Sequence, residues 1–272
     1  MTILVNGQET EHLSVDDRGL QYGDGLFESI ALRDGHPLLW ERHMTRLAEG
    51  CGRLMIPMPD PETLRQEVMR VAQGERLGVA KVILTRGDAG RGYRPMAGTA
   101  CTRIVRRYPW PDFPADNAAT GVPVRWCRLR LSRQPALAGL KHLNRLEQIL
   151  ARMEWQDECA EGLMCDVDGQ VIEGTMSNVF LVHEDALVTP DLIDSGVAGV
   201  MRAEVLARAA KLGIATRISQ VTVTMVENAE ELFLTNSLIG IWPVTRLEMK
   251  PYVVGKTTQT LQAALQTASV TV

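Results

Sequence analysis

A proline-rich segment near the middle of the chain limits how this sequence can fold. Residues 108–119 read Tyr-Pro-Trp-Pro-Asp-Phe-Pro-Ala-Asp-Asn-Ala-Ala and hold three prolines. Proline lacks an amide hydrogen and disrupts helices and central strands, so this stretch favours a linker. Strand and helix patterns occur on both sides of it. We therefore predict a mixed α+β (α/β) fold of two domains, a smaller one at residues 1–115 and a larger one at residues 116–272.

The N-terminal part alternates between strand and helix patterns. Residues 41–55 carry Leu47, Cys51 and Leu54 at helical spacing, and a second helix pattern follows a proline cluster that ends at Pro61. Strands are predicted at residues 2–5, 26–32, 79–84 and 100–105, where β-branched and apolar residues gather. A glycine-rich turn at residues 16–25 separates the first two of these strands.

The C-terminal part repeats this mixture. Its strongest helix pattern covers residues 142–155, with an apolar stripe of Leu143, Leu146, Ile149, Leu150 and Met153. Further helices are predicted at residues 199–212 and 257–268. Strands are predicted at residues 122–127, 161–167, 176–182, 231–234 and 240–244.

Composition narrows the class of protein. The formal net charge of -4 argues against a nucleic-acid binder, which usually carries a basic face. No apolar run is long enough to cross a bilayer, and the N-terminus lacks the pattern of a secretory signal. The five scattered cysteines form no Cys-x-x-Cys pair, which favours reduced thiols over disulfides or a metal site. We expect a cytoplasmic protein without a bound metal.

Lysine is scarce, and one lysine stands in an unusual place. The chain has only five lysines, and Lys141 lies between Leu140 and Leu143 at the start of a predicted helix. A cation is disfavoured at a helix N-terminus, and apolar neighbours favour the neutral, nucleophilic amine. A solvated surface lysine is the ordinary alternative. The contrast with the other four lysines makes Lys141 the candidate catalytic residue.

Several other features suit a single cofactor, pyridoxal 5'-phosphate. It needs an amine for a Schiff base, an acid facing its pyridine nitrogen and donors for its phosphate. Glu173 follows two β-branched residues and is a candidate for the acid, although a solvated turn glutamate is equally ordinary. Glycines at residues 196 and 199 open a predicted helix, where the amides of Val200 and Met201 are candidate phosphate donors. Arg46 and Ser237 are further candidates for the phosphate.

A glycine-rich loop at residues 87–94 supplies candidate substrate ligands. It lacks the Gly-Lys-Ser/Thr ending of a phosphate-binding Walker loop. Arg91 and Arg94 would hold a substrate carboxylate if the loop covers a site. Arg128 and Arg130 are alternatives that the sequence does not separate from them.

These segments together resemble the fold type IV pyridoxal-phosphate enzymes, the group of branched-chain and D-amino-acid aminotransferases and 4-amino-4-deoxychorismate lyases. The resemblance covers nearly the whole chain in the family's order and implies a two-domain, D-amino-acid aminotransferase-like architecture. It implies that the C-terminal domain binds pyridoxal 5'-phosphate. Residues 22–28 look like the family's glycine turn, and His43-Met-Thr-Arg46-Leu47 is similar to the motif whose arginine binds the phosphate.

The same resemblance assigns the remaining cofactor residues. Lys141 matches the Schiff-base lysine, and Glu173 with Asn178 matches the Glu-x-x-x-x-Asn pattern that places an acid at the pyridine nitrogen. The segment from Gly199 to Arg202 matches the phosphate-binding helix start, and Ser237 matches a hydroxyl donor. The family also implies a homodimer.

Within this family, residues 139–148 are most similar to the aminodeoxychorismate lyases, and so is the loop that contains Arg91 and Tyr93. Leu143 and Leu146 lie where branched-chain aminotransferases carry an aromatic hydroxyl. The resemblance therefore implies elimination of pyruvate from 4-amino-4-deoxychorismate to give 4-aminobenzoate, a step of folate biosynthesis. An aminotransferase for D- or branched-chain amino acids is the alternative, and a non-catalytic cofactor-binding protein is a third interpretation.

Overall fold

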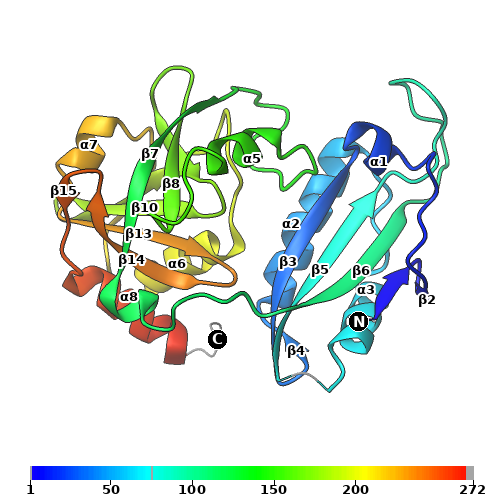
Figure 1. Ribbon diagram of the computed structural model, residues 1–272, viewed down its shortest axis with the longest axis horizontal. Coiled ribbons are helices and arrows are strands. Elements are labelled where there is room, and N and C mark those ends of the chain that lie inside the picture. The colour runs from blue at the N-terminus through cyan, green and yellow to red at the C-terminus, as the bar shows by residue number, and fades with distance from the viewer. Residues whose placement is uncertain (1, 75, 268–272) are drawn as a thin grey trace. The chain divides into compact units, whose positions relative to one another are not determined.

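The computed structural model describes residues 2–74 and 76–267, which fold into two compact units (Figure 1). Unit 1 contains Met1–Pro111 and Leu140–Asn144, and unit 2 contains Asp112–Gly139 and Arg145–Val272. The change of unit after Pro111 falls four residues before the predicted boundary after residue 115. The short segment Leu140–Asn144 was not anticipated in unit 1. It belongs there because its backbone pairs with a strand of that unit.

Unit 1 is built on an antiparallel sheet of six strands in the order β2-β1-β6-β5-β3-β4. The long strands β3 and β5 pair along their full length, from Gly25 opposite Thr85 to Arg33 opposite Leu77. The strands are β1 (Ile3–Val5), β2 (Gln8–Glu9), β3 (Gly25–Arg33), β4 (His36–Pro37), β5 (Leu77–Thr85) and β6 (Thr102–Pro109).

Helices α2 (Trp40–Leu54) and α3 (Pro61–Ala72) lie along one face of this sheet (Figure 1). Alternation along β3 sends Leu26, Ile30 and Leu32 to the buried face, where the apolar stripe of α2 packs. Asp60 begins α3, because its carboxylate accepts the amide hydrogen of Thr63. A short helix, α1 (Arg18–Tyr22), precedes β3.

Unit 2 contains a nine-stranded mixed sheet. Eight strands follow the order β12-β11-β10-β13-β14-β7-β8-β9, and β15 pairs with β14. The strands are β7 (Val122–Leu131), β8 (Glu161–Asp166), β9 (Val171–Gly174), β10 (Asn178–His183), β11 (Ala186–Pro190), β12 (Thr216–Ser219), β13 (Glu231–Asn236), β14 (Gly240–Leu247) and β15 (Lys250–Pro251).

Buried strand residues form the core of unit 2. Phe180 of β10 and Phe233 of β13 are fully buried, and their rings stack with centroids 5.0 Å apart. Burying two large aromatic rings in one place contributes several kilocalories per mole to the core. The helices of this unit are α4 (Asn117–Thr120), α5 (Leu146–Arg152), α6 (Val200–Lys211), α7 (Val223–Glu227) and α8 (Lys256–Thr267).

Several predicted ranges differ from the structure. The predicted helix at residues 142–155 is too long at both ends, since α5 covers Leu146–Arg152 and the backbone of residues 141–143 pairs with β3. The predicted linker at residues 108–119 is shorter, because β6 continues to Pro109 and α4 begins at Asn117. Helix α8 covers most of the predicted range 257–268, of which residue 268 lies outside the described residues. Among the described residues, no helix is long and apolar enough to span a membrane.

Candidate active site

The predicted cofactor residues fall into two groups, one in each unit. Lys141 and Arg46 belong to unit 1, together with the loop of Arg91, Tyr93 and Arg94. The second group belongs to unit 2 and consists of Glu173, Asn178, Val200, Met201 and Ser237.

The segment that contains Lys141 is hydrogen-bonded to the first residues of β3. The amide of Phe27 donates to the carbonyl of Lys141 at 3.0 Å, and the amide of Leu143 donates to the carbonyl of Gly25 at 3.0 Å. Asn144 Nδ2 donates to the carbonyl of Gly23 at 3.1 Å. These bonds keep the lysine segment extended and explain why the helix starts only after Asn144.

Gly25 is required by this close approach. A β-carbon at this position would lie 2.5 Å from the carbonyl oxygen of Leu84 and 2.8 Å from Leu143 Cδ1. A larger residue would therefore push the lysine segment away from β3. The glycines of the turn thus serve the placement of Lys141.

The amine of Lys141 lies over an aromatic ring. Its Nζ is 4.3 Å from the centroid of Phe27, and Nζ of Lys81 is 5.3 Å from the same centroid. A ring face attracts a cation and orients it. The half-buried Lys141 side chain is therefore directed by packing against Phe27.

Arg46 is fixed by a buried carboxylate that the sequence analysis did not identify. Arg46 Nε donates to Glu28 Oε1 at 2.7 Å, and Arg46 Nη2 pairs with Glu28 Oε2. His43 Nδ1 lies 2.6 Å from Glu28 Oε2. Glu28 is 1% exposed. An acidic residue at a buried position of an alternating apolar strand is the feature that would have identified it.

In this cluster the carboxylate of Glu28 is ionised and the ring of His43 is neutral. Burial opposes ionisation of Glu28, but Arg46 and His43 outweigh it and lower the pKa of Glu28 to about 2. Burial lowers the pKa of His43, and the charges of Arg46 and Lys141 act in the same direction, while Glu28 opposes them. His43 is therefore neutral at pH 7 and donates its Nδ1 hydrogen to the carboxylate, since an ionised carboxylate only accepts.

In unit 2, Glu173 and Asn178 bind the two backbone polar groups of the same residue, Val197. The amide of Val197 donates to Glu173 Oε2 at 2.8 Å. Asn178 Nδ2 donates to the carbonyl of Val197 at 2.8 Å. Glu173 is 4% exposed and Asn178 is 5% exposed. The two side chains, which the resemblance grouped in one pattern, thus fix the loop that enters α6.

Glu173 also lies near a buried arginine. Burial lowers the pKa of Arg145, and the negative charge of Glu173 acts against that shift. An ionised carboxylate is the group that would keep a pyridine nitrogen protonated.

The start of α6 presents backbone donors. Gly199 is the N-cap and makes no side-chain capping bond. The amide of Ala203 is the first to bond back to this cap, at 3.0 Å from the carbonyl of Gly199. The amides of Val200 and Met201 therefore belong to the first turn, where a helix offers donors and a positive dipole end to an anion. Ser237 lies half-exposed in the turn after β13.

The loop residues lie in a different environment. Arg91, Tyr93 and Arg94 are exposed, and Tyr93 is 91% exposed. The alternatives Arg128 and Arg130 are exposed as well, and Arg128 Nε lies 3.6 Å from Glu154. Binding of substrate by any of these arginines stays a prediction.

The chain matches a described family over most of its length. The model of amino-transferase class IV matches residues 25–247, which include both groups of candidate residues. The chain belongs to this family. The resemblance inferred from the motifs is therefore confirmed, as is the mixed α+β fold type IV architecture.

Individual relatives match this class IV chain over nearly its whole length. An aminodeoxychorismate lyase from Vibrio harveyi is 35% identical over 97% of this chain and 99% of its own. A D-alanine aminotransferase from Bacillus licheniformis is 27% identical over 98% of this chain and 96% of its own. The crystal structure of a 4-amino-4-deoxychorismate lyase from Pseudomonas aeruginosa is 50% identical, with a TM-score of 0.94, and covers 97% of this chain and 98% of that chain.

The residues of this class IV chain fit pyridoxal 5'-phosphate. They supply a half-buried amine over a ring, a buried carboxylate beside a cation and an uncapped helix start. These are the amine, the acid and the phosphate donors that the cofactor requires. The individual contacts to the cofactor stay predictions.

Proposed function

We propose that this protein is a 4-amino-4-deoxychorismate lyase that uses pyridoxal 5'-phosphate and releases pyruvate and 4-aminobenzoate. The observation that carries the proposal is the full-length similarity to proteins of that name, at 35% and 50% identity. Leu143 packs against Gly25 in this chain, so no aromatic hydroxyl occupies that position. The product would serve folate biosynthesis.

The residues have separate roles in this proposal. Lys141 holds the cofactor through its amine, Glu173 faces the pyridine nitrogen, and Arg46, Ser237 and the start of α6 bind the phosphate. Asn178 supports the phosphate site, since it fixes the peptide that leads into α6. When bound, the cofactor supplies an electron sink that stabilises negative charge on the carbon bearing the substrate amine.

Lys141 performs the proton transfers. Once the substrate amine has displaced Lys141 from the cofactor, the freed neutral amine of Lys141 would remove the proton from the amine-bearing ring carbon, and the bond from the adjacent carbon to the enolpyruvyl oxygen would then break. The same proton, now on Lys141, passes to the departing group, which ends as pyruvate. The ring becomes aromatic, which makes the elimination strongly favourable. Atoms balance, because one substrate gives one 4-aminobenzoate and one pyruvate.

The test is product analysis with a lysine pair. Purified protein with pyridoxal 5'-phosphate receives freshly generated aminodeoxychorismate, and both products are measured. We expect equal amounts of the two products from the wild type and from Lys211→Ala, a lysine at the exposed end of α6. Lys141→Ala should lose at least ~10³-fold in turnover. Near-normal turnover by Lys141→Ala would remove Lys141 from the mechanism.

The aminotransferase alternative has its own signature. Borohydride treatment followed by peptide mapping should attach the cofactor to Lys141 in either case. Only an aminotransferase would then convert the cofactor to its pyridoxamine form with an amino acid and make a new amino acid from a keto acid. That outcome, without pyruvate release, would replace the lyase assignment.

We also infer that the protein works as a homodimer. Helix α5 supports this inference, because four apolar side chains on it are exposed at spacings of three and four residues. Their exposed fractions are 71% for Leu146, 53% for Ile149, 54% for Leu150 and 74% for Met153. An apolar stripe of this kind normally packs, and a two-fold contact would set the same face of α5 against its copy.

The cytoplasm is the proposed location. All five cysteines are free thiols, and Cys51, Cys127 and Cys165 are buried. Free thiols are the usual state of cysteine in a reducing compartment. Detection of the protein in the cytoplasmic fraction of its cell would test this assignment.

A further inference from the structure

The loop between β5 and β6 is longer than the connection requires. The two strands are antiparallel neighbours, yet residues 86–101 separate them without helix or strand. Neighbouring strands are usually joined by two to five residues, and long irregular loops in compact domains are commonly functional. Holding such a loop in one conformation costs conformational entropy at every residue, so an ordered loop needs anchors.

Arg18 is the main anchor of this loop. Its side chain is 3% exposed and extends from α1 to the loop backbone. Arg18 Nη1 donates to the carbonyls of Gly90 at 3.1 Å and Gly92 at 2.6 Å, and Nη2 donates to the carbonyl of Tyr93 at 3.4 Å. One guanidinium thus donates to three carbonyls within four residues, and its planar arrangement of donors suits such a set of acceptors.

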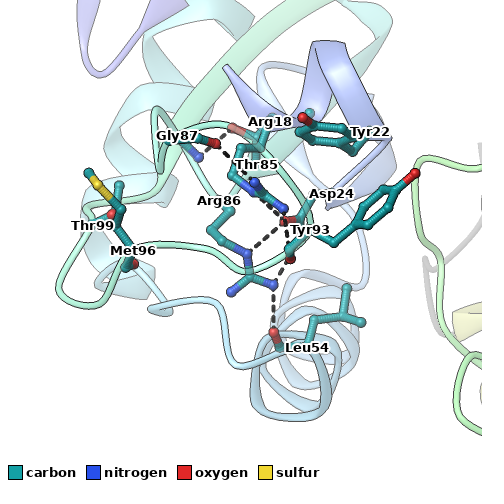
Figure 2. Close-up of polar contacts among 12 residues, drawn as sticks. Arg18, Tyr22, Asp24, Leu54, Thr85, Arg86, Gly87, Tyr93, Met96 and Thr99 are labelled. Atoms are coloured by element: carbon teal, nitrogen blue, oxygen red, sulfur yellow. Dashed lines mark hydrogen bonds and ion pairs between the residues drawn. The ribbon is translucent and has the colours of Figure 1, made fainter. Parts of the chain in front are cut away.

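Tyr22 holds the same part of the loop from a second side. The amide of Gly92 donates to Tyr22 Oη at 3.1 Å. The ring of Tyr22 lies 4.7 Å from Arg18 Cζ and meets the ring of Tyr93 edge-to-face, with centroids 5.9 Å apart. Figure 2 shows Tyr22 and Tyr93 side by side near Arg18. The exposed Tyr93 is therefore oriented even though most of its surface faces solvent.

A carboxylate fixes Arg18 in turn. Asp24 Oδ2 accepts from Arg18 Nε at 2.9 Å and from Arg86 Nε at 2.7 Å (Figure 2). Arg86 also donates to the last carbonyls of α2, those of Leu54 and Met55, at 2.8 and 2.9 Å. Burial opposes ionisation of Asp24, but its hydrogen bonds with Arg86 and Arg18 prevail and lower its pKa. The anchor is therefore charged at neutral pH and tied to a long helix.

The turn that carries these anchors also carries the lysine segment. Gly23 and Gly25 accept hydrogen bonds from Asn144 and Leu143, while Arg18, Tyr22 and Asp24 hold the loop. Residues 18–25 therefore position both the proposed catalytic amine and the proposed substrate ligands. The side-chain contacts of Arg18 go to Tyr22, Asp24 and the loop, so its replacement should leave Lys141 in place.

We propose that Arg18 is a positioning residue that holds the loop at residues 90–93 in the conformation in which Arg91 and Arg94 bind the carboxylates of the substrate. The binding of substrate by Arg91 and Arg94 rests on the proposed lyase function. The anchoring of the loop by Arg18 does not, since it follows from the contacts of Arg18 alone. A protein whose loop is only partly in the competent conformation binds substrate more weakly in proportion to that fraction.

The experiment compares Arg18→Met with Arg103→Met. Arg103 is a suitable control because it also pairs with a carboxylate of unit 1, that of Glu67 at 2.9 Å, and makes none of the contacts described above that hold residues 90–93. Arg18→Lys keeps the positive charge but lacks the planar guanidinium, and it replaces Arg18→Met in the comparison if the methionine variant folds poorly. The three proteins and the wild type are compared by thermal unfolding, limited trypsin digestion and kinetics.

Trypsin reports on the loop without any assumption about function. Cleavage after Arg91 is followed by mass spectrometry, and cleavage after Arg94 is blocked by Pro95. We expect cleavage at Arg91 at least tenfold faster in Arg18→Met than in Arg103→Met at similar melting temperatures. Equal cleavage rates in the two variants would overturn the proposed anchor.

Kinetics report on the substrate. In Arg18→Met we expect KM to rise at least tenfold while kcat stays within about threefold, because bound substrate reorders the loop. A fall in kcat with unchanged KM would overturn the positioning role. No turnover by the wild type would overturn the proposed function and the substrate role together, whereas the digestion result would still decide whether Arg18 holds the loop.

Discussion

Gly199 and Asn178 lie so close that a β-carbon on Gly199 would stand 2.0 Å from Asn178 Oδ1. The backbone of Gly199 has an ordinary φ of -67°, so glycine is required here because there is no room for a side chain and not because of its backbone conformation. Asn178 in turn holds the carbonyl of Val197. Close packing at the start of α6 thus depends on the absence of a side chain at Gly199, and this is where we propose that the cofactor phosphate binds.

Gly199→Ala should therefore weaken binding of pyridoxal 5'-phosphate. The added methyl group must displace Asn178 or the start of α6, and we expect at least a tenfold rise in Kd, about 1.4 kcal/mol. Gly52→Ala in α2 is the control, since its β-carbon meets nothing within 4 Å. Titration of both apoproteins by absorbance would measure the effect. Equal affinities would show that α6 tolerates the shift.

Glu28→Gln should destabilise unit 1 in a pH-dependent way. The change leaves the largely buried Arg46 without its anionic partner, which costs about 3 kcal/mol. Glu28 has a folded pKa of about 2 against an ordinary 4.5, so its contribution is present above about pH 4.5 and is lost as the pH falls toward 2. Urea unfolding at pH 7, 5 and 3 would show the difference between variant and wild type shrinking in acid. A difference that is constant with pH would contradict this account.

The long strands of both units could be predicted because burial follows a simple period. In β3, the even-numbered residues from Leu26 to Leu32 are all buried, and three of these four are apolar, Glu28 being the exception. The helix α2 was predictable for the same reason. Patterns of this kind depend only on which side of an element faces the core.

Residues whose place depends on distant partners were harder to predict. Residues 142–145 were predicted to be helical, yet they do not join the helix because the backbone groups of Lys141 and Leu143 pair with Phe27 and Gly25, more than a hundred residues earlier. Of the predicted apolar stripe, Leu146, Ile149, Leu150 and Met153 share an exposed face of α5 and its C-cap, whereas Leu143 lies outside the helix. The sequence alone does not distinguish Arg18 and Glu28 from ordinary surface charges. Family motifs suggested Lys141 and Arg46 as candidates, but not the residues that hold them.

The cysteines of the native protein should differ in how fast their thiols react with an alkylating reagent. Burial raises the pKa of Cys51 and of Cys127 to about 12, so almost no thiolate is present at pH 8. Cys101 and Cys159 are only partly buried. We expect iodoacetamide at pH 8 to label Cys101 and Cys159 first, and the buried thiols only after unfolding. Peptide mapping over time would measure this order, and early labelling of Cys51 would contradict the packing of α2.

Ile149→Glu should separate the proposed homodimer into single chains. Ile149 lies in the middle of the exposed apolar face of α5, and a carboxylate there would have to be buried without a partner in the dimer. We expect association to weaken by at least ~100-fold, about 3 kcal/mol, in sedimentation equilibrium. Met249→Glu is the control, because Met249 is 90% exposed outside α5 and receives the same new charge. A wild type and a Met249→Glu variant that sediment as dimers, beside a monomeric Ile149→Glu variant, would place the interface on α5. A dimeric Ile149→Glu variant would move the interface to another surface.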